Sequence, residues 1–143
     1  MSYDLMVFEP SAAPRNRDAF MEWFKEQAEW SEDHDYDDHA VTSPALQSWY
    51  KDIIQKYPPM AGPLANYDDV DNPRATDYSI GRNVIYSAFS WSESGEAFTD
   101  MRELAIKHSV GFFDASAVEG EILFPGDAVG EVISIKKPWW KFW

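Results

Sequence analysis

The sequence predicts a single α+β domain with a mostly antiparallel sheet and about three helices packed on one side of it. Three observations predict this class: an apolar run at the start of the chain, three later segments with apolar residues at helical spacing, and pairs of short β-rich runs separated by turn residues. The 143 residues match the usual size of one domain and can bury one core. We therefore expect residues 1–143 to form one domain, with a basic-aromatic C-terminal tail at 136–143.

The first elements follow from apolar spacing. Residues 3–8 form a β-rich apolar run that Glu9-Pro10 ends, which predicts an interior strand. A helix over about 14–30 is predicted by Pro14 in its first turn and by the helical spacing of the apolar residues that follow, which are Phe20, Trp23, Phe24 and Trp30.

The second helix has the clearest signals in the chain. Ser43 provides an N-cap and Pro44 suits the first helical position, while Pro58-Pro59 ends the segment. Its apolar residues recur at helical spacing without a gap, and they are Leu46, Trp49, Tyr50, Ile53, Ile54 and Tyr57. Residues of these types are usually buried, so we interpret the stripe as core.

The second half predicts hairpins around a third helix. Residues 77–80 and 84–89 flank Gly81-Arg82-Asn83, where glycine and asparagine tolerate positive φ. A helix capped by Ser92 or Ser94 is expected to end at Gly111, followed by a hairpin of 111–115 and 121–124 and a strand at 131–135. The proline-rich stretch 58–76 has no periodicity, which is typical of a functional or partly disordered loop.

The charge is strongly and unevenly negative. The chain has 25 acidic and 12 basic residues, a net charge of −13, and residues 26–38 contain acids but no Lys or Arg. Such a chain should repel nucleic acid and anionic membranes, so we expect neither as a partner and expect a basic protein instead. The absence of cysteine, of a signal peptide and of a long apolar run favours the cytoplasm.

Metal and catalytic motifs are incomplete. Asp33, Asp35 and Asp37 have the spacing of a calcium loop, but Asp38 stands where that loop needs glycine and Pro44 where it needs glutamate. His34 and His39 are five residues apart, whereas a zinc-binding pair on one helical face needs four. There is no G-x-S-x-G and no glycine-rich phosphate loop, so we predict no metal, no cofactor and no catalytic residue.

The tail, residues 136–143, combines three lysines with four large aromatic residues. It could anchor at a membrane interface or stack on single-stranded bases. It could also fold back, so that the indoles cover the sheet and the lysines meet the acidic body. We favour the folded-back arrangement because three positive charges act beside a large excess of acid.

Three blocks carry a resemblance: Met1-Ser2-Tyr3-Asp4-Leu5-Met6-Val7-Phe8, Asp77-Tyr78-Ser79-Ile80-Gly81-Arg82 and Gly111-Phe112-Phe113-Asp114. They resemble a group of small, acidic, functionally uncharacterised bacterial proteins. In size, charge and lack of catalytic motifs the chain is also similar to immunity proteins of polymorphic-toxin systems, which neutralise a toxin domain by binding it. This second resemblance implies a binding role and assigns no residues.

The functional prediction is a cytoplasmic protein that neutralises a basic partner, most concretely an immunity-type inhibitor of a nuclease-like toxin whose phosphate sites the acids would occupy. The predicted contact residues are Glu29, Trp30, Glu32, Asp33, Asp35, Tyr36, Asp37 and Asp38 after the first helix, and Asp68, Asp69 and Asp71 in the long loop. Trp30 and Tyr36 would be aromatic anchors.

Three alternatives remain open. The acids can serve solubility alone. The chain can be a small enzyme or small-ligand binder with a pocket lined by aromatic residues such as Trp49, Tyr86 and Trp91. It can also be a structural protein that self-associates through the tail.

Overall fold

The computed structural model describes residues 2–65, 71–118 and 120–125, and the backbone of 131–134. The predicted tail and two of the predicted contact residues, Asp68 and Asp69, lie outside the described residues. Within the described part the elements run in the order β1 (Ser2–Phe8), α1 (Arg17–Gln27), the 3₁₀ turn η1 (His39–Val41), α2 (Pro44–Ile53), β2 (Asp77–Ile80), β3 (Val84–Ser90), the 3₁₀ turn η3 (Trp91–Glu93), α3 (Ser94–His108), β4 (Gly111–Phe113), β5 (Ile122–Phe124) and β6 (Glu131–Ser134).

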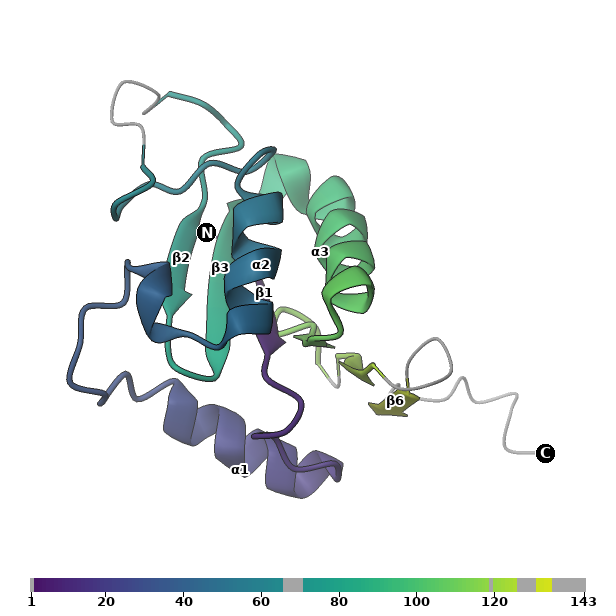
Figure 1. The fold of residues 1–143 in the computed structure, drawn as a ribbon. Coiled ribbons are helices and arrows are strands. Elements are labelled where there is room, and N and C mark those ends of the chain that lie inside the picture. Colours follow the sequence, from purple (N-terminus) through teal and green to yellow (C-terminus); the bar gives the residue numbers. More distant parts are fainter. Residues whose placement is uncertain (1, 66–70, 119, 126–130, 135–143) are drawn as a thin grey trace.

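The described strands form one antiparallel sheet in the order β2-β3-β1-β4-β5-β6 (Figure 1). The first strand lies inside this sheet, as predicted, with Val7 opposite Ile85 on one side and Phe112 on the other. The α+β class, both hairpins and the strand near 131 are confirmed.

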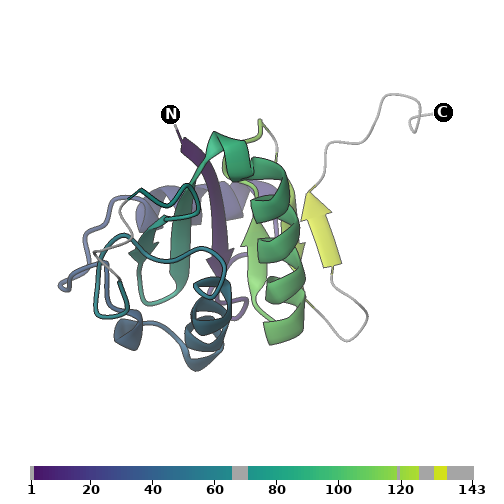
Figure 2. The same ribbon diagram turned by 90° about the horizontal axis from the view of Figure 1, so that it is seen from above.

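The helices cover both faces of the sheet, which corrects the prediction that they pack on one side of it. Leu5 and Val7 belong to the core cluster that contains residues of α2 and α3, while Met6 and Phe8 pack with Phe20 of α1 on the opposite face. Figure 2 shows α1 behind the strands and α3 in front of them, and Figure 1 shows α2 in front of the strands. The physical reason is that successive residues of a strand point to opposite faces, and Leu5 through Phe8 are all apolar and fully buried.

The second helix begins as predicted. The Ser43 side chain accepts a hydrogen bond from the N–H of Leu46 at 3.4 Å, and Pro44 is the first helical residue. The stripe is core: Trp49 and Tyr50 are buried, and the indole N–H of Trp49 donates to the carbonyl of Met101 in α3 at 3.4 Å. This bond satisfies the one polar atom of a buried indole and joins the two helices.

All three helices have different ends from those predicted, and α2 ends at Ile53, four residues before Tyr57, with turns and a bend over 54–57. Helix α1 starts after Asn16, whose side chain accepts from the N–H of Ala19 at 2.9 Å, and it stops at Gln27 because the chain turns at Trp30, which has φ 50°. Helix α3 follows η3 without a serine cap and ends through Ser109 in the left-handed conformation. Gly111 lies in β4 instead, where a Cβ would be 2.2 Å from the ring of Phe8.

The hairpin turn and the long loop also differ in detail. Among the described residues positive φ occurs at Trp30, Ser109 and Gly62, so the turn at Gly81 to Asn83 forms without it. Part of the stretch 58–76 is paired: the N–H of Thr76 donates to the carbonyl of Pro58 at 2.8 Å. No helix in the described part of the chain has the length and apolarity needed to cross a membrane.

Candidate functional site

The acidic loop, residues 29–38, leaves the end of α1 and runs along the outer edge of the sheet. The N–H of Ile80 in β2 donates to the carbonyl of Tyr36 at 2.8 Å. This bond uses an N–H that edge strand β2 would otherwise leave unpaired, and it fixes the middle of the loop to the sheet. The acidic loop is therefore a supported part of the fold.

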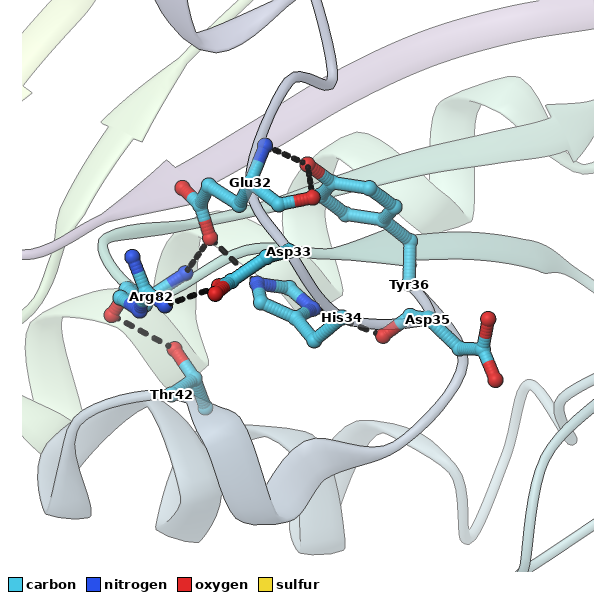
Figure 3. Close-up of polar contacts among 7 residues, drawn as sticks. All are labelled: Glu32, Asp33, His34, Asp35, Tyr36, Thr42 and Arg82. Carbon is cyan, nitrogen blue, oxygen red and sulfur yellow. Dashed lines mark hydrogen bonds and ion pairs between the residues drawn. The ribbon is translucent and has the colours of Figure 1, made fainter.

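Glu32 connects the acidic loop to the β2–β3 turn (Figure 3). Its Oε1 accepts a hydrogen bond from the backbone N–H of Arg82 at 3.0 Å and also contacts Nε2 of His34. The contact is close to Gly81, where a Cβ would lie 3.4 Å from Oε2 of Glu32, at van der Waals distance. On the other side of the turn, the hydroxyl of Thr42 donates to the carbonyl of Arg82 at 3.2 Å.

Asp33 makes the second link to the turn. An Nη2–H of Arg82 donates to its Oδ1 at 2.8 Å, and this hydrogen bond lowers the pKa of the Asp33 carboxyl. The Arg82 side chain is 57% exposed and the Asp33 side chain 91% exposed. Water and salt therefore screen the pair, and it adds little stability. Its effect is to neutralise one charge of the loop with a base that lies far away in the sequence.

His34 is held between two acceptors. Nδ1 lies 2.8 Å from the carbonyl oxygen of Asp35, and Nε2 contacts the carboxylate of Glu32. Only the protonated imidazolium can donate from both ring nitrogens. The hydrogen bonds to the Asp35 carbonyl and then to Glu32 accordingly raise the pKa of His34.

The two predicted aromatic anchors pack inside the acidic loop. The rings of Trp30 and Tyr36 are 5.2 Å apart, and the Tyr36 hydroxyl accepts from the N–H of Glu32 at 2.6 Å. Trp30 also packs against Tyr86 of β3 at 6.1 Å. A left-handed backbone costs a residue with a side chain about 1–2 kcal/mol, and these contacts hold Trp30 in that conformation.

The end of the acidic loop borders a groove. Asp38 caps η1 by accepting from the N–H of Ala40 at 2.9 Å, and the carbonyl of Asp37 lies against Gly62, where a Cβ would be 2.0 Å from it. Burial, followed by the charges of Asp37 and Asp38, raises the pKa of Tyr50 to about 12. The groove has a volume of about 440 Å³ and is lined by His34, Asp35, Asp37, Asp38, Val41, Gly62 and Pro63.

The predicted contact residues thus differ in what they do in the structure. Glu32, Asp33 and Tyr36 hold the loop, and Asp38 caps η1. Asp35 and Asp37 line the groove, and the Asp35 carboxylate points away from the Glu32 and Arg82 cluster in Figure 3. Glu29 and Asp71 are exposed, the latter in the long loop.

Sequence reasoning missed three residues on which the acidic loop depends: His34 as an ion-pair partner, Arg82 and Gly62. The sequence shows His34 inside the acidic run, but it suggests this residue only as a possible zinc ligand. No sequence pattern predicts that Arg82 pairs with Asp33, which precedes it by 49 residues. The described residues contain no group of three or more His, Asp or Glu placed to hold a metal ion.

The three aromatic residues suggested for a ligand pocket do not share one. Trp49 is fully buried between α2 and α3, Trp91 is 48% exposed beside Tyr3, and Tyr86 lies on the α1 face of the sheet. The physical reason is strand alternation, which sends Tyr86 to the face opposite α2. Tyr86 does line a cavity of about 290 Å³, together with residues of β1, β2 and the end of α1.

No protein-family model matches the chain, and comparisons with curated proteins and with solved structures give no significant match.

Proposed function

We propose that this protein binds a basic protein partner through the acidic loop, in the cytoplasm of a bacterium, and that it acts as an immunity-type inhibitor of a nuclease-like toxin. The observation that supports this proposal best is that the acids of the loop have two different roles. Glu32 and Asp33 hold the loop against the β2–β3 turn, while Asp35, Asp37 and Asp38 line one groove.

A supported loop favours binding. Ordering a flexible segment costs free energy at the moment of association, and the acidic loop is already hydrogen-bonded to Ile80 and Arg82 and packed against Gly62. The carboxylates around the groove would therefore meet a partner in a fixed arrangement. Such an arrangement gives specificity as well as attraction.

The net charge of −13 supports a basic partner. A protein with this charge attracts cations over about one Debye length, roughly 8 Å at physiological salt, and repels nucleic acid. A nuclease that binds phosphates carries a basic surface, and carboxylates at fixed positions can occupy the sites of those phosphates. Neutralisation then follows from blocking the surface that the nucleic acid needs.

The experiment begins with affinity capture from the source bacterium and identification of the captured protein. The association rate is then measured at low and physiological salt for the wild type and for the double variant Asp35→Asn/Asp37→Asn. A matched control is Asp18→Asn/Glu103→Gln, which removes the same charge from the start of α1 and from the exposed side of α3.

We expect a basic partner whose association slows steeply with salt. The groove variant should associate about threefold to tenfold more slowly than the wild type, and the control should change much less. The captured protein should lose nuclease activity in the complex. An acidic or neutral partner, or equal rates for both double variants, would refute the proposal.

A further inference from the structure

A second site lies on the α1 face of the sheet, at the corner that the helix leaves uncovered. Helix α1 stops at Gln27, and beyond it the strands β1, β3 and β2 form the floor of the 290 Å³ cavity. The acidic groove borders a different set of residues, so the two sites are separate. Of the acidic loop only Trp30 lines this cavity, and no residue lines both the cavity and the groove.

The floor of the cavity places two carboxylates in one row. Ala88 of β3 pairs with Asp4 of β1 on one side and with Asp77 of β2 on the other. Residues directly opposite in neighbouring strands point to the same face, and two strand spacings separate the outer backbones by roughly 10 Å. The methyl group of Ala88 leaves the space between the two acids open.

The first carboxylate is held in position. Oδ2 of Asp4 accepts from the hydroxyl of Tyr86 at 2.6 Å, and Oδ1 accepts from the hydroxyl of Ser2 at 2.6 Å. Both donors are neutral, so they orient the carboxylate without cancelling its charge, and a carboxylate can accept further hydrogen bonds. Asp77 is exposed at the rim.

Aromatic rings form the wall. Tyr86 lies between Phe24, stacked at 6.3 Å, and Trp30, edge-on at 6.1 Å, and all three rings line the cavity. Among the described residues that line it, none is Lys or Arg. Ring faces attract cations through their quadrupole, and tryptophan does so most strongly.

We propose that this cavity binds an organic cation, a guanidinium or alkylammonium group, between Asp4 and Asp77 and against the rings of Trp30 and Tyr86. The two carboxylates supply charge and hydrogen-bond acceptors. The apolar wall accommodates an alkyl stem, which a hydrated metal ion does not have. This inference stands whether or not the acidic loop binds a basic protein.

The test is a titration of the full-length protein, followed by NMR at the indole N–H of Trp30 and the amide of Ala88. Butylguanidinium is the probe, and butylurea is its neutral counterpart of nearly the same shape. We expect saturable shifts with butylguanidinium and much weaker binding of butylurea. A capped Gly-Arg-Gly peptide tests whether the bound cation belongs to a protein or to a free small molecule. If the peptide binds as tightly as butylguanidinium, the ligand is an arginine side chain of a protein. If the peptide binds more weakly, the ligand is a free small molecule.

Variants distinguish binding in the cavity from attraction by the overall negative charge of the protein. Ala88→Ile fills the floor without changing charge and should abolish binding. Asp77→Asn should weaken binding about fivefold, while Asp71→Asn, an equal charge change at another exposed site, should leave it within about twofold. Because Asp77 is exposed, its variant tests the site even if Ala88→Ile folds poorly. Equal binding of butylurea, or equal loss in Asp77→Asn and Asp71→Asn, would overturn the inference.

Discussion

Glu32 accepts a hydrogen bond at 3.0 Å from the backbone N–H of Arg82, a residue 50 positions later in the chain. Through this contact the acidic loop and the β2–β3 turn stabilise one another. Glu32 is consequently a structural residue within a run of acids that would otherwise only repel one another.

Glu32→Ala should therefore lower the free energy of unfolding. The substitution removes the acceptor of the Arg82 N–H and the partner of His34, and hydrogen bonds to a charged group contribute about 1.5–3 kcal/mol. Glu29→Ala is the matched control, since it removes the same charge from an exposed position and should change stability by no more than about 0.5 kcal/mol. Urea denaturation measures both. Equal effects of the two variants would mean that Glu32 acts only through its charge.

His34 should make stability depend on pH near neutrality. Its folded-state pKa is raised by the Asp35 carbonyl and Glu32, above an unfolded value of about 6.5. A raised pKa means that the folded state binds the proton more tightly, so the stabilisation is complete below about pH 6.5 and is lost as pH rises through the folded pKa. The melting temperature of the wild type should fall over this range relative to that of His34→Gln.

NMR titration of the His34 ring provides the direct measurement. The comparison with His34→Gln removes the pH dependence that comes from all other groups of the protein. A midpoint for His34 at or below about 6.5 would contradict the two-acceptor geometry.

Gly62→Ala should loosen the groove. Gly62 has φ 96°, and a Cβ there would lie 2.0 Å from the carbonyl oxygen of Asp37. The added methyl group must displace the backbone of the acidic loop, which we expect to cost at least about 1 kcal/mol. Gly95→Ala is the control, because a Cβ there meets nothing within 4 Å and alanine favours the helix by up to about 1 kcal/mol. Thermal melts of both variants test the contrast, and a stable Gly62→Ala protein would contradict it.

Local signals predicted the elements of this fold well. Ser43-Pro44 marks the start of α2 because a cap and a first-turn proline act within a few residues. The unbroken apolar run from Leu5 to Phe8 indicates that both faces of β1 are buried, which is inconsistent with the predicted packing of all helices on one face. The end of α1 was not predictable from periodicity, since Trp30 fits the helical pattern but packs on Tyr86.

The site was predicted less completely than the fold. The acidic run identified Asp35 and Asp37, which border the groove, but it could not separate them from Glu32 and Asp33. That distinction depends on Arg82, which tertiary structure alone brings to the loop. The row formed by Asp4 and Asp77 likewise depends on strand register across β3, which spacing along the chain does not reveal.

Asp35→Asn/Asp37→Asn should leave the free energy of unfolding unchanged or raise it. Five carboxylates lie between residues 32 and 38, and their mutual repulsion opposes the folded loop. The two substituted residues border the groove, whereas the loop is held through Glu32, Asp33 and Tyr36. Any gain should shrink at high salt, because salt screens repulsion between exposed charges.

The matched control is Asp33→Ala/Asp38→Ala, which removes the same charge from the same loop. It also removes the partner of Arg82 and the cap of η1, and loss of a cap costs about 0.5–2 kcal/mol. We therefore expect the control variant to have a lower melting temperature than the wild type. The Asp35→Asn/Asp37→Asn variant should have the same or a higher melting temperature, and calorimetry in one buffer measures both. If both pairs destabilise the protein equally, Asp35 and Asp37 are needed to hold the loop, and they are not free to bind a partner.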